Sequence, residues 1–184
     1  MEGFIEVYDN LVPSYLQSQL ESLILGKNPP NHFPLFSSYN LSQGKNADIG
    51  FHNNFSINSD YRYAILQPLY ILGLYKKFVL KNIFINRVFL QPISNNLQIP
   101  TPHVDMVNNL GETIPHLVCL YYVNDSDGDT IFYNKDGSIR KKQSPKKGTI
   151  VFFDGSIKHS AGIPTINERI VINICFEAET LNIN

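Results

Sequence analysis

The chain has 184 residues, 43% hydrophobic and 17% charged, a globular mixture that argues against global disorder and fits a single domain. Fifteen basic against sixteen acidic residues give a net charge of -1, so a generally basic nucleic-acid-binding protein is not the default interpretation. Two cysteines cannot form a disulfide framework, no apolar run could span a bilayer, and the first residues lack a signal peptide's basic region, so we expect a cytoplasmic protein without a membrane segment.

Residues 1–82 are expected to supply helices and loops that support a core formed by residues 83–184 of the same domain. Residues 13–25 place four apolar side chains on one helical face, and Pro13 suits the first turn. Residues 27–59 are rich in Asn, Ser, Gly and Pro, which predicts loop with short extended pieces. A second helix is expected over residues 60–80, with a kink at Pro68.

The remainder of the chain has the pattern of β-strands. Short runs of β-branched and aromatic residues, separated by turn clusters, predict strands at residues 83–90, 117–123, 130–133, 149–153 and 169–176. No helical segments separate them, which argues against a parallel α/β fold. We therefore predict a mainly β fold with N-terminal helices, a sandwich or jelly roll.

Two polar residues stand together in the segment that follows the first of these strands. His103 and Asp105 are two positions apart, so on an extended strand they point to the same side and can hold one ion together. Alone, such a pair is more often a solvated surface loop. His159 supplies a third donor, and two histidines with one carboxylate match the open-sided site of non-haem Fe(II) oxygenases.

Arg169 opens the last predicted strand, ten residues after His159, in a run otherwise dominated by apolar side chains. A buried guanidinium needs a partner, and a carboxylate matches the geometry of its planar fork. The predicted strand therefore carries a candidate carboxylate-binding group.

These motifs, in this order, resemble the 2-oxoglutarate and Fe(II)-dependent dioxygenases, specifically their prolyl-4-hydroxylase-like branch, over residues 83–176. Residues 119–124 are similar to a strand with a Tyr-Leu-Asn-type ending, residues 127–130 to a Gly-Gly-x-Thr turn, and residues 147–153 to the strand that leads to the distal histidine. The resemblance implies a double-stranded β-helix, a form of jelly roll. It also implies Fe(II), 2-oxoglutarate and O2, with ascorbate as a candidate reductant.

The resemblance also assigns roles. Three residues would hold Fe(II): His103, Asp105 and His159. Arg169 would pair with the distal carboxylate of 2-oxoglutarate, Tyr122 would assist at the same carboxylate, and Asn173 would lie beside the co-substrate. Gln91 occupies a position where related enzymes often carry a tyrosine, so substrate contacts there do not transfer.

The implied activity is oxidative decarboxylation of 2-oxoglutarate coupled to hydroxylation of a second substrate, with release of succinate and CO2. A prolyl residue of a peptide or protein is the substrate that this branch implies. Three alternatives remain open: a nucleobase or free amino acid oxygenase, a non-catalytic jelly-roll binding module, and a metal-binding cupin. Residues 26–59 and 106–115 are candidates for closing over the substrate.

The other reactive side chains favour structural interpretations. Three histidines lack partners at metal-ligand spacing and are expected to be structural or at the surface: His32, His52 and His116. Cys119 and Cys175 are interpreted as small buried hydrophobic residues. Arg87 fits a pocket wall and a structural ion pair equally well.

Residues 135–147, here called the basic segment, contain six basic side chains against one acidic residue. The favoured interpretation is a solvated hairpin tip. The alternative is a docking strip for an acidic peptide or a phosphate backbone, which leaves a nucleic-acid contact open.

Overall fold

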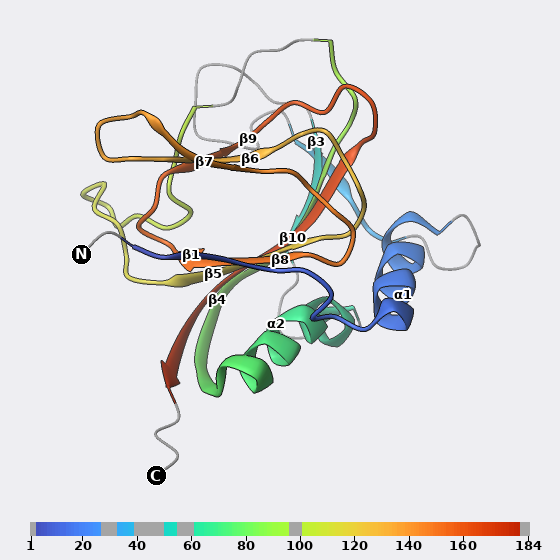
Figure 1. The fold of residues 1–184 in the computed structure, drawn as a ribbon, viewed down its shortest axis with the longest axis horizontal. Coiled ribbons are helices and arrows are strands. Elements are labelled where there is room, and N and C mark those ends of the chain that lie inside the picture. The colour runs from blue at the N-terminus through green and yellow to red at the C-terminus, as the bar shows by residue number, and fades with distance from the viewer. Residues whose placement is uncertain (1–2, 27–32, 39–49, 55–60, 96–100, 181–184) are drawn as a thin grey trace.

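The computed structural model describes residues 3–26, 33–38, 50–54, 61–95 and 101–180. These residues form two antiparallel sheets, one seven-stranded in the order β1-β8-β5-β10-β4-β3-β2 and one three-stranded in the order β7-β6-β9. Figure 1 shows the smaller sheet on one side of the larger and the two helices on the other side. The mainly β, antiparallel architecture agrees with the predicted jelly roll.

The larger sheet consists of β1 (Ile5–Tyr8), β2 (Phe36–Ser38), β3 (Gly50–Asn54), β4 (Phe78–Gln91), β5 (Leu117–Tyr122), β8 (Ile150–Asp154) and β10 (Arg169–Thr180). The smaller sheet consists of β6 (Thr130–Tyr133), β7 (Ile139–Gln143) and β9 (His159–Ala161). The helices are α1 (Ser14–Leu25) and α2 (Arg62–Lys76).

Residues 169–176 of the central strand β10 are buried on both faces, which explains their mostly apolar sequence. Successive side chains of a strand point to opposite faces. Ile170, Ile172 and Ile174 therefore pack into the cluster that includes both helices, whereas Val171 and Cys175 face the interior between the two sheets. The odd-numbered residues of β10 from 169 to 175 thus line the interior, and this alternation positions the site described below.

Helix α2 ends earlier than predicted. Lys77 adopts a left-handed conformation (φ 56°), and its backbone N–H donates to the carbonyl of Gly73, which terminates the helix. Phe78 then begins β4 and pairs with Thr180 at the end of β10. The helix predicted over residues 60–80 is therefore wrong for residues 78–80, because pairing with β10 overrides their local preference.

Strands from the first part of the chain join the same sheet as the later ones. β1 pairs with β8, and β3 pairs with β4 and β2, all antiparallel. Residue 82 lies inside β4, so the sheet runs continuously through the position where the sequence pattern changes. No helix in the described part of the chain is long and apolar enough to cross a bilayer.

Candidate functional site

His103 and His159 are brought together by a short backbone bridge. The N–H of each residue donates to the carbonyl of the other at 2.9 Å, and their ring centroids lie 4.9 Å apart. Residues that exchange both hydrogen bonds in this way have side chains on the same face. His103 lies in an isolated bridge rather than in an extended strand of the kind that the sequence suggested. The two backbone hydrogen bonds of this bridge still hold His103 beside His159.

Asp105 completes the group from the same segment. Arg87 on β4 donates to its Oδ1 at 2.6 Å, and Asn173 on β10 donates to its Oδ1 and Oδ2 at 3.2 and 3.3 Å. The Nε2 of His159 lies 3.6 Å from Oδ2. The Asp105 side chain is only 1% exposed, so these partners from three strands fix the orientation of its carboxylate.

The donor atoms of these three residues suit a single metal ion. One ligand atom from each of His103, Asp105 and His159 lies within 4.8 Å of the others. The Nδ1 atoms of the two histidines lie 3.3 Å from the carbonyl of Thr101 and 3.1 Å from that of Ile157. Because a carbonyl only accepts, each Nδ1 carries the proton and each Nε2 is left for a metal.

The protonation states also match. Burial opposes ionisation of Asp105, but attraction by His159, Arg87 and His103 outweighs it and lowers the pKa of this carboxyl to about 2. Burial lowers the pKa of His159, although Asp105 acts in the opposite direction. Near neutral pH the site therefore offers the ionised carboxylate of Asp105 and the neutral imidazole of His159, the forms in which these groups bind metals.

Arg169 lies at the other end of the same interior face. It is 4% exposed, and its two terminal nitrogens donate at 2.9 Å to Oε1 of Gln91 and to Oγ1 of Thr130. Both acceptors are neutral, and the Nε of Arg169 has no hydrogen-bond partner. Among the described residues no carboxylate forms a salt bridge with this guanidinium, so its positive charge is available to an anion.

Local sequence features hold Arg169 at the start of β10. The side chain of Asn124 clamps the strand entrance, donating to the carbonyl of Glu168 at 2.7 Å and accepting from the N–H of Ile170 at 3.0 Å. Gly128 lies so close that an added Cβ would be 3.1 Å from Cδ of Arg169 and 3.0 Å from the carbonyl of Gly162. The asparagine and the glycine of the two sequence motifs thus pack directly around the arginine.

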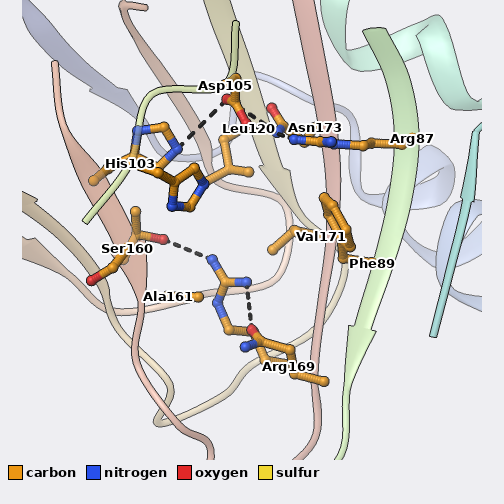
Figure 2. Close-up of a pocket in the computed structure, with 13 residues that line it drawn as sticks. Arg87, Phe89, His103, Asp105, Leu120, Ser160, Ala161, Arg169, Val171 and Asn173 are labelled. Atoms are coloured by element: carbon orange, nitrogen blue, oxygen red, sulfur yellow. Dashed lines mark hydrogen bonds and ion pairs between the residues drawn. The ribbon is translucent and has the colours of Figure 1, made fainter. Parts of the chain in front are cut away.

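A small pocket of about 70 Å³ connects the metal-binding group with the guanidinium. Its walls come from β4, β5, β6, β9 and β10 and from the segment that carries His103 and Asp105. Figure 2 shows the guanidinium of Arg169 directed from the lower part of the pocket toward the region of His103 and Asp105. The predicted metal ligands, Arg169 and Asn173 all line this pocket.

Tyr122 lies behind the pocket wall rather than on it. It is fully buried, and its hydroxyl donates at 2.7 Å to Oγ1 of Thr130, the same atom that accepts from Arg169. Burial raises the pKa of Tyr122 to about 12, so the phenol stays protonated. Tyr122 therefore supports the arginine through Thr130, and its direct contact with a co-substrate stays a prediction.

The structure adds two pocket residues that the sequence motifs did not single out clearly. Thr130 joins Tyr122 to Arg169, and its place in the Gly-Gly-x-Thr-like turn was the available signal. Arg87 combines both interpretations left open above: it lines the pocket and forms an ion pair with Asp105. Its guanidinium also lies 4.6 Å from the ring centroid of Phe89.

The two segments that are candidates for closing over the substrate differ in how much of each the structure describes. Most of the segment 26–59 lies outside the described residues, and its described strands β2 and β3 belong to the larger sheet. Residues 106–115 form a closed turn in which Val107 bridges Thr113 and Asn108 bonds to Glu112. His32 lies outside the described residues, and closure by either segment stays a prediction.

Neither a protein-family model nor a curated protein matches the chain, but solved structures do. A Pseudomonas putida prolyl-4-hydroxylase is 14% identical, with 94% of this chain and 91% of that chain covered at a TM-score of 0.62. A Trichoplax adhaerens prolyl hydroxylase, solved with a hypoxia inducible factor peptide fragment, is 14% identical (94% and 82% covered, TM-score 0.65). A Burkholderia pseudomallei oxidoreductase of the 2OG-Fe(II) oxygenase family is 10% identical (95% and 84%, TM-score 0.67).

The chain has the fold of the 2-oxoglutarate/Fe(II) oxygenases. The family resemblance found in the sequence is therefore confirmed at the level of the fold, with prolyl hydroxylases among the similar structures. The similarity covers more than nine-tenths of this chain, so it extends well beyond the region of the motifs into the residues before 83.

Proposed function

We propose that this protein is an Fe(II)- and 2-oxoglutarate-dependent dioxygenase that hydroxylates a second substrate. One observation carries the proposal: a two-histidine, one-carboxylate group and a buried arginine with only neutral partners line the same pocket. A dicarboxylate with a keto acid at one end complements both features. The keto acid suits the metal, and the distal carboxylate suits the guanidinium.

The residues present fit Fe(II) as the resident metal. His103, Asp105 and His159 would hold it and leave positions open on the pocket side. Bound iron would supply the one-electron and oxygen chemistry that side chains lack. The protein's own part is to hold Asp105 ionised through Arg87 and Asn173 and to fix one end of the co-substrate through Arg169.

The proposed substrate is a prolyl residue in a peptide or protein. It is supported by the prolyl hydroxylases among the similar structures, one of which was solved with a peptide. The alternatives on the same scaffold are a nucleobase or a free amino acid. A non-catalytic binding module has no need for the complete metal group together with an unpaired buried arginine, which argues against that class.

The basic segment is a candidate contact for acidic groups of the substrate. Two of its six basic side chains are engaged within the chain, because Lys147 pairs with Glu21 at 2.6 Å and Arg140 donates to the carbonyl of Gly3 at 2.8 Å. Lys135, Lys142 and Lys146 are exposed. A proline peptide panel that varies the number of acidic residues, tested with the wild type and with Lys142→Glu, measures this contribution through KM.

Anaerobic titration with Fe(II) and 2-oxoglutarate tests the activity. A weak visible charge-transfer band is expected, followed by succinate formation when air is admitted in the presence of ascorbate. His103→Ala should lose the band, whereas His52→Ala, on β3 and outside the pocket, should keep it. Absence of both the band and succinate in the wild type contradicts the proposal.

Product analysis then identifies the substrate. Proline-containing peptides, free amino acids and single-stranded methylated oligonucleotides are offered in parallel, and hydroxylated or demethylated products are measured by mass spectrometry. Hydroxylation confined to the peptides supports the prolyl assignment. Turnover of only the oligonucleotides or only the amino acids replaces it.

A further inference from the structure

A second group of metal-binding side chains shares Asp105 with the site described above. It comprises Asp105, His116 and Cys175, and one ligand atom from each lies within 4.8 Å of the others. Cys175 lies two residues beyond Asn173 on the interior face of β10, and His116 immediately precedes β5, the neighbour of β10. The two strands thus extend the interior face past Asp105, on the side away from Arg169.

His116 has a free donor atom inside the protein. Its Nδ1 lies 2.6 Å from the carbonyl of Ile114, so Nδ1 carries the proton and Nε2 keeps its lone pair. Nε2 is buried without a hydrogen-bond partner, and the residue is only 7% exposed. A buried polar atom without a partner destabilises the folded protein, so a ligand that binds Nε2 would remove this cost.

The thiol of Cys175 provides the second donor. Cys175 is fully buried and faces Asp105 from β10. Cys119, the other cysteine, is equally buried but belongs to the apolar cluster on the opposite face of the larger sheet. The two cysteines therefore differ in their surroundings, although the sequence favoured the same interpretation for both.

We propose that Asp105, His116 and Cys175 form a second metal site, selective for thiophilic divalent ions such as Zn²⁺. A thiolate and a carboxylate together neutralise a divalent charge, which burial demands, and a thiolate donor favours zinc over iron. Tetrahedral zinc with bonds of about 2.0–2.3 Å needs donors roughly 3.3–3.8 Å apart. Side-chain movements of about 1 Å would close the present group to that size, and coordination would displace the thiol proton.

The shared carboxylate gives this site a regulatory consequence that goes beyond the proposed oxygenase function. Zinc held by His116 and Cys175 would take Asp105 from His103 and His159, leaving two ligands for iron. The pocket already reaches Asp105, so both ions have the same route of entry. Zinc would then inhibit iron binding through a distinct ligand set rather than by replacement at the same three residues.

Cobalt titration of the metal-free protein under anaerobic, reducing conditions tests the site without reference to activity. Co²⁺ bound to a thiolate gives an intense near-ultraviolet charge-transfer band, which a site of only histidine and carboxylate does not give. The wild type, Cys119→Ala and His159→Ala should show the band, and Cys175→Ala should lose it. Zn²⁺ added afterwards should abolish the band by displacing Co²⁺.

Each other outcome overturns the assignment. No band in the folded wild type, a band that survives Cys175→Ala, or a band lost in Cys119→Ala contradicts it. If Cys175→Ala fails to fold, as judged by circular dichroism, His116→Gln serves instead and should weaken Co²⁺ binding by at least about tenfold, the loss of one ligand interaction. Succinate formation without the cobalt–thiolate band supports the oxygenase proposal and contradicts the second metal site. The cobalt–thiolate band without succinate formation supports the second metal site and contradicts the oxygenase proposal.

Discussion

Arg169→Met separates the role of the buried guanidinium in folding from its role in binding. In the ligand-free protein the arginine has two neutral hydrogen-bond partners, Gln91 and Thr130, and no carboxylate within salt-bridge distance in the described part of the chain. Burying the ion costs several kcal/mol, and two hydrogen bonds from a charged donor return about 1.5–3 kcal/mol each. We therefore expect the free energy of unfolding of the ligand-free variant to change by less than about 2 kcal/mol.

Binding of 2-oxoglutarate should change far more. The guanidinium can offer the distal carboxylate two charge-assisted hydrogen bonds, and losing both costs at least about 3 kcal/mol, or a factor of more than about 100 in the dissociation constant. Pyruvate is the matched control, because it shares the keto acid and lacks the distal carboxylate. The wild type should prefer 2-oxoglutarate strongly over pyruvate, and Arg169→Met should bind the two with similar affinity.

Isothermal titration of the manganese-loaded protein with each ligand measures this preference, and urea unfolding measures stability. An Arg169→Met protein that keeps the wild-type preference for 2-oxoglutarate would refute the assignment of Arg169 to the distal carboxylate. A large loss of stability without ligand would show instead that the guanidinium is mainly a structural element.

Three further predictions concern the surroundings of Asp105. Arg87→Met should lower the stability of the metal-free protein by about 3 kcal/mol, because it leaves the buried carboxylate of Asp105 without its ion pair. Saturating Mn²⁺ should restore most of the lost stability. If urea unfolding shows the same loss with and without Mn²⁺, the prediction is wrong. The pKa of Asp105 is lowered from 3.8 to about 2, so its ionisation adds about 2 kcal/mol to the free energy of unfolding above pH 4, and this contribution is lost as the pH falls toward 2. Asp105→Asn should lack this part of the acid dependence of unfolding. An acid profile identical to that of the wild type rejects this prediction. Gly155→Ala should lower the free energy of unfolding by about 2 kcal/mol in thermal unfolding, because the added Cβ would lie 2.2–2.4 Å from ring atoms of His116. Ser156→Ala, at an exposed position, is the control. Equal stability of the two variants disproves the packing argument.

The sequence predicts the β part of the fold better than the first part. Five predicted strands correspond to β4, β5, β6, β8 and β10, because their apolar runs are bounded by turn residues. The bounds of β5, β6 and β8 agree to within one residue, whereas β4 begins five residues earlier and β10 ends four residues later than predicted. β1, β7 and β9 were missed, since short mixed runs and a lysine-rich run carry little strand signal by themselves. Pairing with β8 and with β6 makes them strands, and a single sequence does not contain that information directly.

The site was predictable where a residue type is tied to one chemistry. The structure brings together His103, Asp105 and His159, the three donors that the sequence grouped by residue type and order, and their binding of a metal stays a prediction. Tyr122 was harder, because alternation places its side chain on the interior face but does not say whether the hydroxyl reaches the pocket or Thr130. The proximity of His116 to Cys175, 59 positions later, follows only from the pairing of β5 with β10.

The charged side chains of the pocket couple binding at its metal-ligand end to binding at its Arg169 end. Besides its histidines, the pocket is lined by three ionic side chains, Arg87, Asp105 and Arg169, which together carry one net positive charge before any ligand enters. A divalent ion alone raises this charge to three, and dianionic 2-oxoglutarate brings it back to one. In a buried pocket such like charges repel strongly, so under the proposed function the metal and the co-substrate would each improve the other's affinity, and by thermodynamic linkage the two effects would be equal. In an oxygenase of the proposed kind, Arg87 would therefore hold Asp105 in place for the metal and would also make iron bind more tightly when the co-substrate is present.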